Sequence, residues 1–187
     1  MTLASRSSLA EVAAAVATAL DRAGIVAVLT GGACATLYTG GTYQSNDLDF
    51  IVRSGGTRRA LDAAMASIGF ARNGDRYVHP ASPFFVEFPR GPLAIGDDVH
   101  ITPVAVKLGG GTVLALSPTD ACRDRLAAFY HWSDRQSLQV AVEIALAHRV
   151  NMKTIRDWST REGHVDRHDE FRRELDKRRQ QRRPRAR

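Results

Sequence analysis

The order of apolar and polar positions divides the chain into an alternating α/β region and an all-helical region. Residues 8–22 carry apolar side chains at helical spacing, whereas residues 25–29 and 47–52 are short apolar runs typical of buried strands. Over residues 117–176 the spacing is helical throughout. The pattern therefore predicts an α/β domain over residues 1–116, followed by a helical segment that packs against it.

Turn and cap residues complete this outline. Gly31-Gly32 leads into a short helix over residues 33–38, and Ser117 followed by Pro118 is a favourable helix start, with Ser as N-cap and Pro at the first position. Asn73-Gly74 marks a turn between strands. The remaining expected elements are a helix over 57–68 and strands around 70–72, 76–79, 84–88, 99–106 and 112–116.

Two acidic side chains stand inside one of the predicted strands. Asp47 and Asp49 alternate with Leu48 and Phe50, so the carboxylates share one face while the apolar side chains point into the core. Burying two carboxylates side by side is unfavourable because both lose solvation and they repel each other. We therefore expect a cation between them, and Mg²⁺ is the simplest candidate. The alternative is a pair of acids at a strand-edge turn.

The glycine pair upstream of these acids suggests a phosphate site. At a helix N-terminus, Gly31 and Gly32 let a polyphosphate approach the backbone N–H groups, and the helix dipole favours its negative charge. Glycine pairs are also common at tight strand-to-helix turns. The phosphate site is therefore inferred from the spacing between the glycine pair and Asp47. Metal and phosphate sites that face each other are what nucleotidyl transfer requires.

Positive charge is concentrated at the C-terminus. Residues 1–152 carry 13 basic and 13 acidic side chains, so the net charge of +6 arises in the last 35 residues. Residues 177–187 carry seven basic side chains and no acidic one. We expect a disordered basic tail that lies along the phosphates of tRNA or another RNA; a solubilising tail is the alternative.

The remaining composition indicates a cytoplasmic protein with no membrane partner. No apolar run approaches about 18 residues, and the Ala-rich N-terminus is interrupted by Arg6 and Glu11, unlike a signal peptide. Cys34 and Cys122 are isolated in the sequence and are interpreted as core residues.

A helix opened by Gly-Gly, followed by Asp-hydrophobic-Asp on a strand, resembles the nucleotidyltransferase superfamily that includes DNA polymerase β. The resemblance implies a mixed β-sheet flanked by helices, with a third carboxylate on a neighbouring strand. Glu87 in FFVEFP is the best match for that acid, although it could instead pair with Arg76 or Arg90. Ser45 matches a position where the family often places a hydroxyl near the phosphates.

The helical region that begins SPTDACRDRL is similar to that of the AbiEii-type minimal nucleotidyltransferases, a class that includes many toxins of toxin–antitoxin pairs. Asp120 matches an acid at a helix start, and Arg125 stands where the class usually has Lys. Asp134-Arg135 replaces an Arg-Asp pair in reversed order, with a helix N-cap as the alternative role for Asp134. The resemblance implies a cognate antitoxin protein as a partner.

Together these resemblances imply a Mg²⁺-dependent enzyme that transfers a nucleoside monophosphate from a nucleoside triphosphate (NTP). The acceptor is an RNA such as tRNA, a protein hydroxyl or a small molecule. Two Mg²⁺ ions are expected on Asp47, Asp49 and Glu87. The alternative function is a nucleic-acid-binding or regulatory module, of antitoxin type, that has kept the fold and lost catalysis. The expected nucleotide-binding residues are Gly31, Gly32, Ser45, Lys107, Arg125 and Asp134.

Overall fold

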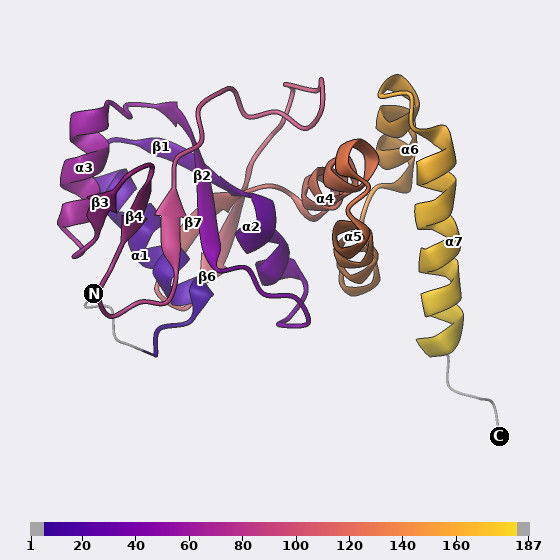
Figure 1. Cartoon of the computed structure of the whole chain (residues 1–187), viewed down its shortest axis with the longest axis horizontal. Helices are drawn as coiled ribbons and strands as arrows, with labels where there is room; N and C mark the ends of the chain where they lie inside the picture. The colour runs from indigo at the N-terminus through magenta and orange to yellow at the C-terminus, as the bar shows by residue number, and fades with distance from the viewer. Residues whose placement is uncertain (1–5, 183–187) are drawn as a thin grey trace.

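A seven-stranded mixed sheet forms the centre of the N-terminal region (Figure 1). This computed structural model describes residues 6–182. The strands are β1 (Val26–Thr30), β2 (Asp47–Ser54), β3 (Ala71–Asn73), β4 (Arg76–Val78), β5 (Phe85–Glu87), β6 (Val104–Leu108) and β7 (Gly111–Ala115). Their order in the sheet is β3-β4-β5-β2-β1-β7-β6, which places β2 at the centre.

Strand directions in this sheet are mixed, as the resemblance to nucleotidyltransferases implies. β2 runs antiparallel to β1 and parallel to β5, and β1 runs parallel to β7. The two outer hairpins, β3-β4 and β6-β7, are antiparallel, as is the β4-β5 pair. The strand that carries the paired acids is therefore held by a neighbour on each side.

Three helices flank the sheet: α1 (Leu9–Arg22), α2 (Gly31–Tyr38) and α3 (Arg58–Ala66). Ser8 is the N-cap of α1 and forms a capping box with Glu11, and beyond the helix the chain turns through Gly24, where φ is +68°. α1 packs against β1, β7 and α3, whereas α2 packs against β1 and β2. α2 also contacts the C-terminal helices and so joins the two regions.

The C-terminal region is helical, as expected. It consists of α4 (Pro118–Trp132), α5 (Arg135–Ala147), α6 (Met152–Arg161) and α7 (Val165–Arg182). α4 starts at the predicted cap, where the side chain of Ser117 accepts a hydrogen bond from the Asp120 backbone N–H. In Figure 1, α4 and α5 lie between the sheet and α7, which is the element farthest from the sheet.

The expected disordered tail is wrong for residues 177–182, which form the last turns of α7. The physical reason is a partner on another element: Arg178 and Arg182 both donate to the carboxylate of Glu143 on α5. A local count of charges cannot reveal that partner. Residues 183–187 lie outside the described part of the chain.

One continuous hydrophobic core extends through both regions. Leu48 and Phe50 of β2 are fully buried, as are Trp158 of α6 and Phe171 of α7. The C-terminal helices are therefore part of the same folded unit as the sheet. Within residues 6–182, none of the helices combines the length and apolar character needed to cross a membrane.

Candidate active site

Three carboxylates lie at neighbouring positions of two parallel strands. Asp47 and Asp49 stand on β2, and Glu87 ends β5 at the position paired with Asp49. Asp47 is paired with Phe85 in the same register. Since Leu48 between the two aspartates is fully buried on the other face, alternation presents all three carboxylates on one face of the sheet.

Asp49 is at the electrostatic centre of this cluster. Burial raises the pKa of Asp49 to about 6, and repulsion by Asp47 and Glu87 contributes to the shift. Asp124 of α4 raises this pKa further, while Arg125 opposes the change. A positive charge placed among these carboxylates would therefore be stabilised.

The glycine pair packs closely against the residues around the acids. At Gly31, where φ is +62°, a Cβ atom would lie 2.6 Å from Oδ2 of Asp49. At Gly32 a Cβ atom would lie 2.7 Å from Oγ of Ser45 and 3.0 Å from the hydroxyl of Tyr43. A side chain at either position would collide with these neighbours unless they shifted, and the N-terminus of α2 consequently lies close to Asp49 and Ser45.

Ser45 connects the acid-bearing strand to α2. Its hydroxyl donates to the carboxylate of Asp47, and its backbone N–H donates to Oγ1 of Thr36 at 3.0 Å. Thr36 in turn donates to the carbonyl of Gly32 at 3.0 Å. These bonds fix the loop between α2 and β2, so that the hydroxyl of Ser45, the glycine pair and the acids come together as expected.

α4 adds the charged pair Asp124–Arg125 to the site. Only Arg125 was predicted from the sequence. Asp124 accepts from Arg125 at 2.6 Å (Nη2) and 3.0 Å (Nε). Burial alone would lower the pKa of Arg125, but Asp124, Tyr43 and Asp49 raise it, so the guanidinium stays charged. Asp124 and Tyr43 are the residues that sequence reasoning missed. Asp124 has no local signal, because only the packing of α4 against α2 brings it to the acids, whereas Tyr43 lies in the loop between α2 and β2, with its hydroxyl beside Gly32.

Lys107 is not brought to this site. It lies exposed on the edge strand β6, paired with Thr112 at the start of β7. β7 runs parallel to β1, and Ala115 near the end of β7 pairs with Leu29 near the end of β1. Because β1 leads directly into Gly31, Lys107 belongs to the opposite end of the sheet from the glycine pair.

Asp134 is the N-cap of α5, which is the alternative role suggested for it by the sequence. Its carboxylate accepts from the backbone N–H groups of Gln136 at 2.9 Å and Ser137 at 3.1 Å. Hydrogen bonds from the Ser137 side chain and backbone, and from Gln136, lower the pKa of Asp134, and Arg125 lowers it further. The residue therefore acts first as a helix cap.

The chemistry of the carboxylate cluster suits Mg²⁺, which prefers oxygen ligands. In the part of the chain that the structure describes, however, no three His, Cys, Asp or Glu side chains stand close enough to hold one ion as they are placed. Asp47 is turned toward Ser45, and Glu87 toward Arg76, whose Nε lies 3.8 Å from its Oε1. Rotation of these two side chains is what metal binding would require.

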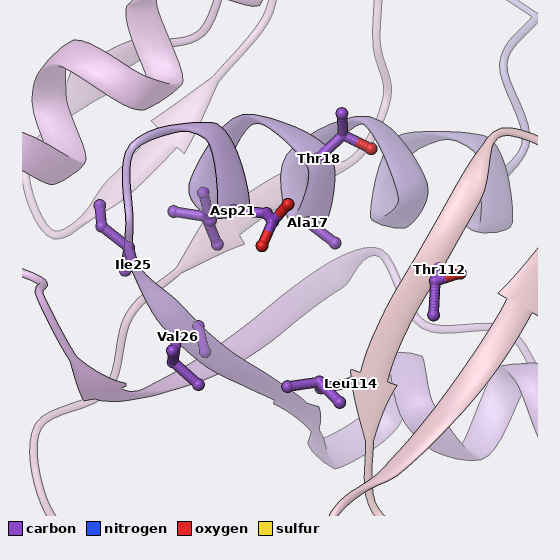
Figure 2. Close-up of a pocket in the computed structure, with 9 residues that line it drawn as sticks. Ala17, Thr18, Asp21, Ile25, Val26, Thr112 and Leu114 are labelled. Atoms are coloured by element: carbon purple, nitrogen blue, oxygen red, sulfur yellow. The ribbon is translucent and has the colours of Figure 1, made fainter.

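A separate cavity of about 390 Å³ lies away from the acids, between α1 and the strands β1 and β7 (Figure 2). Thr18 and Asp21 of α1 line it from one side, and Val26 and Leu114 line it from the strands. Asp21 is the only ionisable side chain among its lining residues. The cavity therefore offers no cluster of catalytic groups.

Comparison with known proteins agrees with this geometry at the level of the fold. The sequence matches no family model and no curated protein. Among solved structures, it is similar to an antigenic nucleotidyltransferase-like protein from Paracoccidioides brasiliensis, with a TM-score of 0.57 and 18% identity over 77% of this chain and 78% of that one. The chain has a nucleotidyltransferase fold. A second match is the antibiotic-resistance factor ANT(2″)-Ia, with a TM-score of 0.49 and 13% identity over 83% of this chain and 94% of that one. The first of these two matches confirms the expected nucleotidyltransferase fold.

Proposed function

We propose that this protein is a Mg²⁺-dependent nucleotidyltransferase that transfers a nucleoside monophosphate from an NTP to an acceptor hydroxyl. The observation that carries the proposal is the convergence of Asp47, Asp49 and Glu87 beside the glycine-opened N-terminus of α2. One half of this arrangement suits a cation and the other half suits a polyphosphate. A triphosphate bound across both halves has its α-phosphate next to the carboxylates.

In the proposed reaction, the acceptor oxygen forms a bond to the α-phosphorus. The bond from that phosphorus to the bridging oxygen breaks, and pyrophosphate leaves with the electron pair. Glu87 receives the proton of the acceptor hydroxyl and returns it to solvent. Bound Mg²⁺ supplies charge stabilisation at the phosphates and acidifies the acceptor hydroxyl. Asp47 and Asp49 are the residues that would hold it.

The residues around the acids are assigned to the triphosphate. The backbone N–H groups at Gly31 and Gly32 and the hydroxyl of Ser45 bind the β- and γ-phosphates. Arg125, which stays charged beside Asp49, neutralises negative charge that develops during transfer. Asp124 holds the guanidinium of Arg125 in place through two hydrogen bonds.

RNA such as tRNA is the acceptor that we favour, because exposed basic side chains continue along α7. They attract phosphates without regard to sequence. The cognate antitoxin and the cytoplasmic location stay predictions. The exposed basic residues of α7 are Arg172, Arg173, Lys177, Arg179 and Arg182.

The decisive experiment incubates the purified protein with each α-labelled NTP, Mg²⁺ and total RNA. We expect label to appear in RNA, and we expect Asp49→Ala to reduce the transfer by more than about a thousandfold, as loss of a central catalytic group does. Asp21→Ala is the matched control, because Asp21 lies beside the remote cavity. Absence of both label transfer and Mg²⁺-dependent nucleotide binding in the wild-type protein would reject the proposed function.

The pair between Glu87 and Arg76 favours a second candidate, a binding module without catalysis. In such a protein Glu87 serves the ion pair with Arg76 and accepts no proton from an acceptor hydroxyl. The same assay separates the candidates, because a binding module retains RNA in the presence of Mg²⁺ but transfers no label. Calorimetry with RNA alone provides the corresponding affinity.

A further inference from the structure

A groove next to Glu87 is the strongest unassigned feature of the molecule. Two adjoining hollows of about 470 and 380 Å³ share four lining residues, Arg58, Phe88, Pro89 and Arg90. Glu87 lines the first hollow, so the groove adjoins the third carboxylate of the candidate active site. It leads from there past both arginines toward the start of α3.

The two arginines make one section of this groove cationic. Both side chains are exposed, and among residues 6–182 no salt bridge to either one is formed within the protein. Arg58 is the first residue of α3, where the helix dipole already favours negative charge. A positive side chain at a helix N-terminus is repelled by the helix dipole. An anion bound beside Arg58 would offset this repulsion.

The rest of the groove is not cationic. Asp75 and Glu87 supply acidic groups in the hollow nearest the acid cluster, whereas Val52, Leu61 and Phe88 give the other hollow an apolar lining. A ligand that matches this order has a hydroxyl near Glu87 and an anionic group near the arginines. A cationic acceptor would meet repulsion from both arginines.

We propose that the groove binds the acceptor, and that the acceptor carries a phosphate close to its reacting hydroxyl. The phosphate lies between Arg58 and Arg90, and the hydroxyl points toward Glu87. The end of a nucleic-acid strand and a small phosphorylated molecule share this chemistry. The assignment of the reacting hydroxyl rests on the proposed function; the phosphate site does not depend on it.

The test measures binding by calorimetry with two probes, a single-stranded tetraribonucleotide with a free 3′-hydroxyl and a hexose phosphate. Arg58→Ala and Arg90→Ala should each weaken binding of the probe that the groove accepts by about tenfold, as expected when a charged hydrogen bond is lost. Arg59→Ala is the matched control, because Arg59 is the next residue on the same helix, is also exposed and does not line the groove. Arg90→Lys should keep part of the affinity.

Each outcome decides the proposal. Arginine-dependent binding of the oligonucleotide alone identifies a nucleic-acid acceptor, and arginine-dependent binding of the hexose phosphate identifies a small one. Equal affinity in the wild-type protein and both Ala variants, or no binding of either probe, overturns the proposed groove. Binding of Mg²⁺·ATP, measured in parallel, should be unchanged in the Ala variants, and its absence in the wild-type protein would count against the proposed reaction and not against the phosphate site.

Discussion

At the scale of single residues, Asp49 shows how a partly buried cluster of carboxylates lowers stability. Its pKa lies near 6 because burial and neighbouring carboxylates disfavour the charged form. Between about pH 4 and 6 the folded protein holds a proton at Asp49 that the unfolded chain has already released. The free energy of unfolding therefore falls as the pH rises through that window, and the full penalty is present above it.

We predict that Asp49→Asn stabilises the protein near neutral pH but not in acid. With allowance for partial exposure of the carboxyl group, the gain at about pH 8 is about 1 to 2 kcal/mol, and at about pH 4 it approaches zero. Urea unfolding of the wild-type protein and the Asp49→Asn variant across the pH range measures this difference in the free energy of unfolding. A constant difference at all pH values would contradict the pKa assigned to Asp49.

Removal of a neighbouring charge provides a second prediction. Glu87→Gln should lower the pKa of Asp49 from about 6 toward its usual range, because one source of repulsion is lost. Carboxyl NMR chemical shifts recorded during a pH titration give the value directly. Asp62→Asn, on α3 and bonded to Tyr77 and Arg72, is the control that should leave it unchanged.

At the scale of elements, the features that depend on local sequence pattern could be predicted from the sequence. The Ser117 cap, the acid-bearing face of β2 and most of the strands follow from periodicity and capping rules, but the strand expected over 99–106 begins only at Val104. Contacts between distant elements were beyond reach. Asp124 reaches the acids only because α4 packs against α2, and Lys107 fails to reach them because it lies at the opposite end of the sheet from Gly31.

The N-terminus of α2 provides a prediction at this scale. Gly32→Ala puts a methyl group 2.7 Å from Oγ of Ser45, so either the hydroxyl or the helix must shift. We expect weaker Mg²⁺·ATP binding and up to about a hundredfold slower transfer, as for small displacements of catalytic groups. Gly109→Ala, where no heavy atom lies within 4 Å of the added Cβ, should behave like the wild-type protein in both assays.

A substitution at the start of α5 should affect stability and leave nucleotide binding unchanged. Asp134→Ala removes two N-cap hydrogen bonds and should lower the free energy of unfolding by about 1 kcal/mol. Nucleotide affinity should change little, since the carboxylate is already engaged by the helix. A large loss of Mg²⁺·ATP binding in a folded variant would return Asp134 to the nucleotide site.

At the scale of the whole molecule, the long loop between β5 and β6 ties the sheet to the C-terminal helices. Arg123 of α4, with a side chain only 3% exposed, contacts Asp98 of the loop and Asp120 of its own helix. Trp158 donates from Nε1 to the carbonyl of Ile95 at 3.2 Å. Because α4 also carries Arg125, this junction fixes the position of a site residue.

We therefore predict that Arg123→Ala is strongly destabilising. It leaves Asp98 and Asp120 without their main cation, and loss of one member of a largely buried ion pair typically costs about 3 kcal/mol or more. Thermal or urea unfolding measures the loss. Arg161→Ala, which removes a largely exposed side chain 3.9 Å from the same Asp98, should change the free energy of unfolding by less than about 1 kcal/mol.

The same junction contains its own optical reporter. The chain has two tryptophans: the side chain of Trp158 is fully buried at the junction, whereas Trp132 at the end of α4 is 76% exposed. Aqueous quenchers such as acrylamide should extinguish the emission of Trp132 first and leave a blue-shifted signal from Trp158. Loosening of the loop from the helices then registers as a red shift in that residual fluorescence, without any label having been attached.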